Sequence, residues 1–587
     1  MDDIPRREFG TLLAASLGIT AGCSNLMTST QPTSNATEST PANEPNGAGN
    51  ITVVTTTEEL QAAFDDLSRG DTIRITDENA PYRTTSWLDI DVDGVTVVGP
   101  GVQTLVKPDT RANVGGIRIG HHERCREIDV RGVGYHGNRD NQGSSAERLH
   151  GISVRNAENV TITRNQIRET HPRKHGNGGS GISVTPRCSD VRIFNNQIHE
   201  FGDRGIQLGG KRLMAFGNVV TNGLDRPIAC DLWYPDGKNR TAQSVSIFGN
   251  LVGNSVEGSL IGVARNTPTA SNKGYVNVFG NVGFGSHKSF CHVRGPKALQ
   301  NISIQNNVSL QKTAGLHTEQ TTEFAGIAVD VAKGRNLAIR NNELYDYSGH
   351  GIHIDSDVED VTVQQNSVIR PGLTGIRLVD ATNGLVDGNL VTEPSEAGIR
   401  LKQTANLALR GNYVERAGTY GIETSGARSS GSGNDVAINY VVANDRRSDG
   451  NLPAILVRDV GTRVRGNTVR GTAGPAIAEA DGAARNLYEN NWADDTEPWQ
   501  ISAPSSQVRN HTPALGVHRN LSPPSGSNEI AVEFDKPYAR SPRLAFGRGR
   551  TAVQDVAYET DSGGNYVGAT ITTEGSDPTL DVFVDAT

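Results

Sequence analysis

The sequence contains no run of 18 apolar residues, so no membrane-spanning helix is expected. It has only five cysteines, too few for a disulfide scaffold, and none shows the C-x-x-C spacing of a zinc site. We therefore expect Cys125, Cys188, Cys230 and Cys291 to be small core residues. Lys and Arg (56) do not outnumber Asp and Glu (65), and the net charge is -9. This balance argues against a nucleic-acid partner, which usually requires a concentrated basic face.

Glycine is abundant, with 67 residues, and it marks a short internal repeat between residues 351 and 424. Each unit opens with Gly-Ile-x-aliphatic and closes on Asn-x-Val, and Asn366, Asn389 and Asn412 are 23 residues apart. A unit of this length holds three short strands with their turns and no amphipathic helix. The alternation of Ile352 with Ile354 indicates strands with one buried face.

These repeats predict an all-β chain whose main domain is a right-handed parallel β-helix of about 13 coils. One unit cannot bury its apolar face alone, so successive units stack into a solenoid. We expect the recurring Asn at the turn between the second and third strands, because Asn tolerates the left-handed backbone conformation and its amide bonds its own backbone. Stacked turn asparagines are also expected to bond each other from coil to coil. A propeller or a leucine-rich horseshoe disagrees with the period and with the missing Leu and helix pattern.

The turn asparagines recur along the chain at uneven spacing. They are Asn165, Asn196, Asn218, Asn250, Asn281, Asn307, Asn342, Asn366, Asn389, Asn412, Asn439 and Asn467. Because a strand cannot lengthen without losing register, the surplus residues are expected in loops at the turns. The longest insertions are 168–180, 233–244, 264–275 and 310–325. Their clustering predicts a groove walled by loops over this part of the solenoid.

The N-terminal residues 1–23 carry two export motifs. Arg6-Arg7-Glu8-Phe9 before an apolar run resembles a twin-arginine signal, and Thr20-Ala21-Gly22-Cys23 resembles a lipobox with Cys23 as the lipidated residue. We expect export by the twin-arginine pathway and an extracellular protein attached to the cell membrane only through this lipid anchor. Residues 24–50 are rich in Ser, Thr, Asn and Pro, which predicts a disordered tether.

The rest of the chain divides into four segments. Residues 51–105 are expected to form an N-terminal cap, with a helix that begins at the capping box of Thr56 and Glu59 and ends at Gly70. The β-helix is assigned to 106–500 and a Pro/Ser-rich linker to 501–527. Alternating apolar residues in 528–587 predict a small antiparallel β-sandwich, either a passive cap or a module for binding or for forming trimers. The chain is accordingly expected to be a monomer or a trimer.

Outward side chains of the repeat are the candidate functional residues. In Gly-Ile-x-Ile-x the x residues point away from the core, so stacking arranges them in columns about 4.8 Å apart. Two regions carry charged columns. The catalytic candidates are His353, Asp355, Asp330, His350, Asp231 and Arg204, and the substrate-binding candidates are Arg377, Arg400, Lys402, His175, Trp233, Tyr234, Lys238 and Arg294.

This combination of residue types suits an acidic sugar. A cation neutralises the uronate carboxylate, a base abstracts the C5 proton, and an acid protonates the leaving oxygen. The cation is Arg, Lys, or a Ca²⁺ ion held by Asp330 and Asp355, so the expected cofactor is Ca²⁺ or none. Trp233 and Tyr234 would form a platform on which a sugar stacks. A hydrolase would instead need two carboxylates, for which Asp330 with Asp355, or Asp203 with Asp231, are available.

The cap motif and the repeats together resemble the pectate lyase-like right-handed β-helix superfamily over residues 51–490. The cap combines Thr56-x-x-Glu59-Leu60 with Gly70-Asp-Thr-Ile and Gly94-Val-Thr-Val. The segment Tyr135–Gln142 resembles the DGNxxNQ turn of several members, with His136 in place of Asp. The resemblance implies an extracellular protein that acts on polysaccharides.

No single enzyme family of this superfamily is indicated. Gly351-Ile-His353-Ile-Asp355 offers the Asp and His pair of mannuronan epimerases in swapped order and without the Pro. The set of motifs typical of polygalacturonases is missing. We therefore expect a lyase or epimerase acting on a uronate-containing glycan, with a non-catalytic glycan-binding surface protein and a glycoside hydrolase as alternatives.

Overall fold

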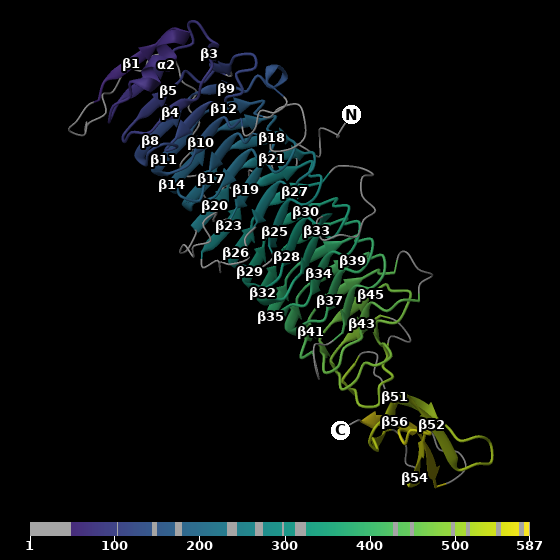
Figure 1. The fold of residues 1–587 in the computed structure, drawn as a ribbon. Helices are drawn as coiled ribbons and strands as arrows, with labels where there is room; N and C mark the ends of the chain where they lie inside the picture. Colours follow the sequence, from purple (N-terminus) through teal and green to yellow (C-terminus); the bar gives the residue numbers. More distant parts are fainter. Residues whose placement is uncertain are drawn as a thin grey trace, which may run out of the picture.

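The computed structural model describes residues 49–102, 104–143, 149–170, 179–231, 244–264, 274–295, 299–311, 324–426, 432–445, 451–494, 499–511, 517–547, 553–574 and 580–585. Within these ranges the chain is nearly all-β and forms an elongated solenoid that ends in a small separate β-module (Figure 1). No helix among them is long and apolar enough to cross a membrane.

A short helix covers the first coil, as the capping box predicted. Strand β1 (Ile51–Val54) leads into helix α2 (Thr57–Asp65). The Glu59 amide donates to Thr56 Oγ1 at 3.2 Å, and the Thr56 amide donates to Glu59 Oε2 at 3.1 Å. Leu60 and Phe64 are buried against the first strands. The capping box satisfies backbone amides at the N-terminus of the helix, and the helix closes the open end of the apolar core.

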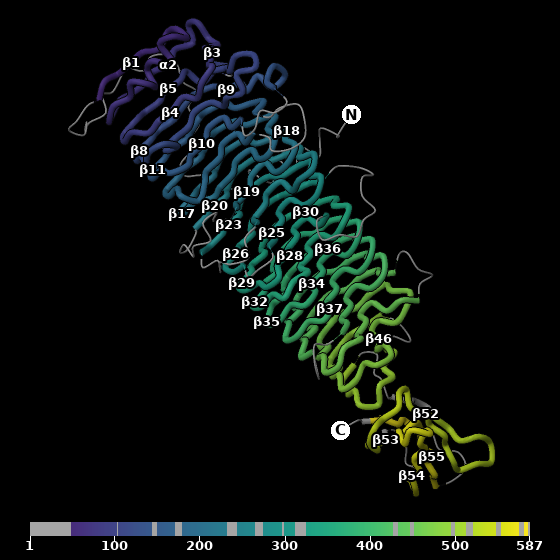
Figure 2. Tube along the Cα trace, in the orientation of Figure 1, coloured from purple at the N-terminus to yellow at the C-terminus, as the bar shows by residue number. Residues whose placement is uncertain are grey.

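Beyond the helix the chain winds through three parallel sheets, here called A, B and C. Sheet A has 18 strands, whereas sheet B, from β3 (Tyr82–Thr84) to β48 (Trp492–Ala493), and sheet C, from β4 (Leu88–Ile90) to β49 (Trp499–Gln500), have 16 each. In the Cα trace, successive coils wind in the same direction along the solenoid (Figure 2). Sheets B and C therefore contain more strands than the predicted 13 coils, and one strand of each, β3 and β4, lies in the segment 51–105.

The core consists of aliphatic residues stacked over their counterparts in the next coil. Ile352 pairs with Ile376, which pairs with Ile399, and all three are fully buried. Stacking of like residues removes apolar surface from water along the whole length of the solenoid. The four cysteines predicted to lie in the core are buried and unpaired by disulfides. Burial raises the pKa of the Cys188 thiol to about 11.

A continuous ladder of asparagines runs along the core between sheets A and B. Each Nδ2 donates to the Oδ1 of the next asparagine, from Asn165–Asn196 at 3.0 Å to Asn467–Asn491 at 2.9 Å. The ladder therefore extends one residue past the predicted set and ends where the Asn491 amide donates to His511 Nδ1. The predicted bonds between stacked turn asparagines are confirmed.

The predicted conformation of these asparagines was wrong. The left-handed residue of the turn is the one before the ladder position, such as Arg164 (φ 57°) or Gln365 (φ 53°). Where the turn allows it, this residue is Gly388 or Gly411, which adopt positive φ without steric cost. The ladder asparagine is committed to hydrogen bonds with both neighbouring coils, so the preceding residue makes the turn.

The C-terminal module consists of two three-stranded antiparallel sheets, as predicted for a small sandwich. One sheet has the order β51 (Val517–Leu521), β56 (Leu580–Asp585), β53 (Arg543–Gly547), and the other β52 (Glu529–Tyr538), β55 (Tyr566–Thr573), β54 (Val553–Thr560). Strand β51 begins inside the segment predicted as a linker, in which β50 (Gln507–Arg509) still belongs to sheet A. Lys536 joins the two parts by donating to the Ser506 carbonyl, and burial lowers its pKa to about 8.

One buried carboxyl group weakens the solenoid above pH 6. Asp459 is 2% exposed, and burial raises its pKa from 3.8 to about 6. The unfolded group is charged above pH 4, so the cost of burying the charge grows between pH 4 and pH 6 and is complete above pH 6. A shift of this size corresponds to about 3 kcal/mol.

Asp459→Asn is therefore expected to raise the free energy of unfolding by up to about 3 kcal/mol at pH 7.5 and to leave it unchanged near pH 4. Urea unfolding at the two pH values measures this difference, with Asp481→Asn, a change at an exposed residue, as the control. An equal gain at both pH values would show that the charge is not responsible.

Candidate functional site

The predicted outward columns of sheet C are present and in register. The strands concerned are β16 (Ile206–Leu208), β19 (Ile228–Asp231), β22 (Ile261–Ala264), β25 (Cys291–Gly295), β28 (Ile327–Val331), β31 (Ile352–Asp355), β34 (Ile376–Val379), β37 (Ile399–Lys402) and β40 (Ile422–Ser425). The first outward column reads Gln207, Ala229, Gly262, His292, Ala328, His353, Arg377, Arg400 and Glu423. This register also resolves the stretch 228–294, which no Gly-Ile marks.

Several of these outward side chains are buried, although charged outward residues are usually solvated. His353 is 1% exposed and His350, which lies just before β31, is 2% exposed. Their rings meet edge to face with centroids 4.4 Å apart. Burial lowers the pKa of His350 to about 3 and that of His353 to about 2, so both imidazoles are neutral at neutral pH.

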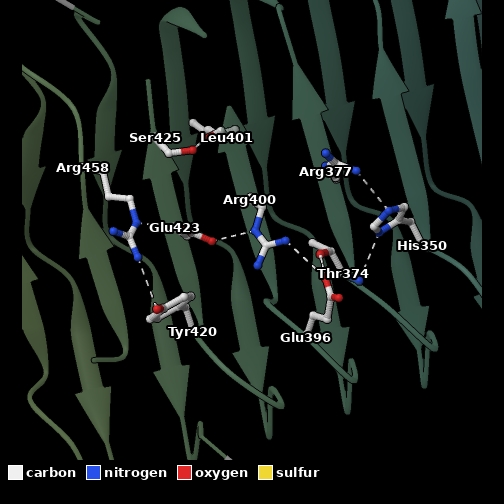
Figure 3. A network of polar contacts seen from close by, with 10 residues as sticks. All are labelled: His350, Thr374, Arg377, Glu396, Arg400, Leu401, Tyr420, Glu423, Ser425 and Arg458. Carbon is white, nitrogen blue, oxygen red and sulfur yellow. Dashed lines mark hydrogen bonds and ion pairs between the residues drawn. The ribbon is translucent and has the colours of Figure 1, made fainter. Parts of the chain in front are cut away.

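The hydrogen bonds of His350 fix its tautomer. Its Nδ1 lies 3.1 Å from the backbone amide of Thr374, which can only donate, so Nδ1 carries the lone pair. The proton of the neutral ring is therefore on Nε2. This Nε2–H faces Arg377, whose Nη1 lies 3.5 Å away and also carries only protons (Figure 3). Two donors thus border the same space.

His353 adds two unused ring nitrogens beside these donors. Neither its Nδ1 nor its Nε2 has a hydrogen-bond partner among the residues that the structure describes. The Asp355 carboxylate lies 4.0 Å from Nε2, and its side chain is 45% exposed. Leaving a buried imidazole without partners costs free energy, which is typical of a group reserved for a ligand.

Among the described residues, no carboxylate forms a direct ion pair with Arg377, although the charges of Asp355, Glu396 and Glu423 act on it. Burial lowers the pKa of its guanidinium, and the carboxylate of Asp355 opposes this shift. Its Nε is buried without a partner in the described part of the chain. The guanidinium remains charged at any physiological pH and retains unused donors.

Arg400 lies one strand further and is fully engaged. Its Nε donates to Glu423 Oε2 at 2.6 Å and its Nη1 to Glu396 Oε2 at 3.2 Å. Glu423 also binds Arg458 at 3.2 Å, and Glu396 accepts from Thr374 Oγ1 at 3.1 Å (Figure 3). The network links Arg400 to Thr374, whose amide orients His350, and so fixes the ring beside Arg377.

The second outward column holds the other predicted residues of this region. Arg294 and Asp330 are paired in register on β25 and β28, and Asp355 continues the column on β31. Lys402 follows two strands later and is exposed. Ca²⁺ takes six to eight oxygen ligands. Asp330 and Asp355 offer two carboxylates, and the Arg294 guanidinium lies in the same column. These two carboxylates alone do not complete a Ca²⁺ site.

A group of potential metal ligands does occur elsewhere in the described chain. Asp89, Asp91 and His122 have ligand atoms within 4.8 Å of one another. Arg118 already binds both oxygens of Asp89, at 2.6 and 2.5 Å. The guanidinium occupies the position that a cation would take.

Arg204, just before β16, and Asp231, at the end of β19, belong to a separate cluster. The Arg204 guanidinium bridges two carboxylates, with Nη1 2.5 Å from Asp203 Oδ2 and Nε 3.4 Å from Asp231 Oδ2. Gln207 donates to Asp231 at 2.8 Å and accepts from Ser183 at 2.9 Å. Burial raises the pKa of Asp203, and the charge of Arg204 opposes that shift.

The two clusters are too far apart to act on one sugar. Stacked Phe194, Phe216 and Phe248 give the rise per coil directly, with ring centroids 4.8 Å apart. Strands β19 and β31 are four steps apart in sheet C, which is about 19 Å at the usual strand spacing. The predicted catalytic residues therefore fall into two sites.

Some predicted residues cannot be placed. His175, Trp233, Tyr234, Lys238 and Cys23 lie outside the described residues, as do most of the inserted loops. Sequence reasoning in turn missed the network that orients His350. Glu423 could have been found, because Gly421-Ile-Glu423 repeats the Gly-Ile-x motif. Thr374, Glu396 and Arg458 follow no repeat rule.

Comparison with known proteins adds to the description of the fold. No curated protein matches the sequence. Among solved structures, the chain is similar to an alginate lyase from Paenibacillus sp. (12% identity, 62% of this chain and 94% of that one, TM-score 0.33). It is also similar to the A-module of a mannuronan C-5 epimerase from Azotobacter vinelandii (16%, 79% and 97%, TM-score 0.26).

A third similar structure is PfbA, a surface adhesin of Streptococcus pneumoniae (12%, 72% and 88%, TM-score 0.35). In sequence, residues 325–493 match the family described as "right handed beta helix region". The matched residues include β28 and the three strands that follow it in sheet C. Of these, β31 carries His353, β34 carries Arg377 and β37 carries Arg400. The segment with the buried histidines is thus a right-handed β-helix by both sequence and structure.

Proposed function

We propose that sheet C binds an acidic polysaccharide and that the site at His350, His353 and Arg377 abstracts the C5 proton of a uronate unit. The observation that carries this proposal is the convergence of two donors, His350 Nε2–H and the Arg377 guanidinium, beside the unpartnered His353. Two donors that face one space require an acceptor between or in front of them. A carboxylate supplies two acceptor oxygens and a charge that matches Arg377.

Each residue then has a defined part in the reaction. Arg377 and His350 bind the uronate carboxylate and stabilise the negative charge that spreads onto it when C5 loses its proton. His353 is unprotonated at neutral pH and accepts that proton. The bound carboxylate and Asp355 stabilise the imidazolium that forms, because nearby negative charge raises the pKa of histidine.

Two outcomes share this first step. In β-elimination the C4–O4 bond breaks, the C4=C5 double bond forms, and O4 takes a proton from solvent as it leaves. In epimerisation a proton from solvent reaches C5 on the opposite face, and no glycosidic bond breaks. In both cases the His353 imidazolium then returns its proton to solvent. The geometry of Arg377, His350 and His353 supports the common step, so lyase and epimerase are both included in the proposal.

The remaining functional features are proposed on the sequence motifs. The protein is exported by the twin-arginine pathway and held outside the cell by a lipid on Cys23, where extracellular polymers are accessible. Its partner is a polysaccharide rather than a nucleic acid. It acts as a monomer or a trimer, without a cofactor or with Ca²⁺.

Incubation of the purified protein with pectate, alginate and other uronate polymers tests the proposal, with and without Ca²⁺. Ultraviolet absorbance reports unsaturated uronates, and proton exchange at C5 in D₂O reports epimerisation. Absence of both signals across the panel would contradict the proposal. Glycan binding without turnover would then favour the non-catalytic surface protein.

A hydrolase is the second candidate function, and it uses the other cluster. Arg204 holds Asp203 and Asp231 together, and the raised pKa of Asp203 favours a proton donor next to a second carboxylate. New reducing ends without unsaturated products, lost in Asp231→Asn and retained in His353→Ala, would identify this site as the active one.

A further inference from the structure

A cavity of about 370 Å³ opens on the outer face of sheet B, away from both clusters of sheet C. It lies over β12 (Gln166–Arg168), β15 (Gln197–His199) and β18 (Val219–Gly223), near the capped end of the solenoid (Figure 1). Its polar lining includes Arg168, Glu169, Gln197, His199, Glu200 and Asn222. This volume is within the range of small-molecule binding sites.

The lining contains two glutamates stacked in one column. Glu169 and Glu200 directly follow β12 and β15, and both take the left-handed conformation, with φ of 54° and 55°. Their backbones are therefore one coil apart. Like charges in this arrangement repel each other and destabilise the fold.

The same turn position is paired with opposite charge further along sheet B. Arg370 donates to Asp346 at 2.7 Å, and Arg416 lies 3.1 Å from Glu393, again across adjacent coils. At the cavity, by contrast, glutamates occupy this turn position on two adjacent coils. Two like-charged residues stacked beside a cavity are typical of a binding site, where function rather than stability determines the residues.

Among the described residues, Glu169 faces a neutral histidine, and Glu200 faces a guanidinium at a longer distance than in the two ion pairs above. The backbone amide of Asn138 donates to His136 Nδ1, so the proton of this ring is on Nε2, 3.4 Å from Glu169 Oε1. Burial lowers the pKa of His136 to about 4 and also lowers that of His199, so both rings are neutral. Within the described ranges, the guanidinium of Arg139 lies 3.9 Å from Glu200.

We infer that this cavity is a second glycan-binding site, which takes an uncharged, hydroxyl-rich sugar. The carboxylates of Glu169 and Glu200 accept hydrogen bonds from sugar hydroxyls, and Arg168, Gln197 and Asn222 supply donors. Arg168 donates from Nη2 to Thr104 Oγ1 at 2.8 Å, and its guanidinium carries further donors for a ligand. Among the described lining residues, one guanidinium and two carboxylates give a net negative charge, which disfavours the acidic polymer proposed for sheet C.

The test uses the full chain, an array of neutral glycans, and calorimetry with the neutral oligosaccharides that bind. Binding is expected, and the double variant Glu169→Gln/Glu200→Gln is expected to weaken it at least tenfold while the melting temperature stays equal or rises. Glu393→Gln is the matched control, since it removes a glutamate from the same turn position on β36 (Leu390–Thr392). Gln197→Ala, at an exposed residue, provides a second variant that does not disturb the fold.

Arg377→Ala separates this site from the one on sheet C, because it should leave neutral-sugar binding unchanged. Three results would overturn the inference. In the first, no neutral glycan binds. In the second, a neutral glycan binds, and the double variant does not change its affinity. In the third, no sugar binds, Ca²⁺ alone binds, and the double variant abolishes the binding of Ca²⁺. The last result would identify a cation site.

Discussion

Arg377→Ala is expected to lower kcat/KM on the acidic polymer by about 10³-fold, because removal of one preorganised charged donor typically costs this much. The loss should appear in kcat as well as in KM, since the carboxylate gains charge as C5 loses its proton. Binding of the unreacted polymer should weaken less than turnover. Steady-state kinetics with the responsive polymer measures both constants.

Arg340→Ala is the matched control for this variant. Arg340 is an exposed arginine at the end of β29 (Gly334–Arg340) in sheet A, in the coil that contains β28. It carries the same charge and lies on another face, so its removal should leave the rate unchanged. If both variants lost activity equally, the effect would be due to net charge and not to the proposed site.

Asn342→Ala is expected to reduce the free energy of unfolding by on the order of 4 kcal/mol, since it leaves several buried polar groups without partners. Asn342 Nδ2 donates to the Ile304 carbonyl at 2.9 Å and to Asn366 Oδ1 at 2.9 Å. Its Oδ1 accepts from the Asn307 amide at 3.2 Å and from Asn307 Nδ2 at 2.9 Å. Alanine satisfies none of these groups.

The midpoint of chemical unfolding, together with hydrogen exchange of the Asn307 amide, measures the loss. Asn277→Ala serves as the control, because Asn277 lies on the outer face of β23 (Tyr275–Phe279) and outside the ladder. A change there should stay within about 0.5 kcal/mol. Equal losses at both positions would refute a special role of the ladder.

The sequence was sufficient for the scaffold because the scaffold is what the repeat encodes. Gly351-Ile352 and Asn366 recur at fixed spacing, and stacking like on like leaves one arrangement that buries every aliphatic residue. The same rule placed His353, Arg377 and Arg400 in one column. It could not reveal the left-handed residue of each turn, because Arg164 or Gln365 give no such signal in the sequence.

The chemistry of the site was less accessible from the sequence. Burial of His353 and the tautomer of His350 depend on contacts across coils, for which no spacing rule exists. The sequence placed Asp231 and Arg204 in a second charged region, and the register puts that region about four strand spacings, ~19 Å, from His353. It did not show which of the two regions holds the active site. The glutamate pair of sheet B went unnoticed because Glu169 and Glu200 are at turn positions, which the Gly-Ile motif does not mark.

The asparagine ladder also gives the solenoid a net dipole along its long axis. From Asn165 to Asn467, every Nδ2 donates one proton to the next asparagine of the ladder and the other to a carbonyl of the preceding coil, as Asn342 does to Ile304. Every Oδ1 accepts from the preceding coil, so the side-chain dipoles of the ladder share one direction. Such a chain polarises cooperatively, and each bond strengthens its neighbours. At the far end burial lowers the pKa of His511 to about 4, so a neutral ring presents its lone pair to the Asn491 amide. The core of this protein therefore contains a long row of aligned amide dipoles, surrounded by aliphatic side chains.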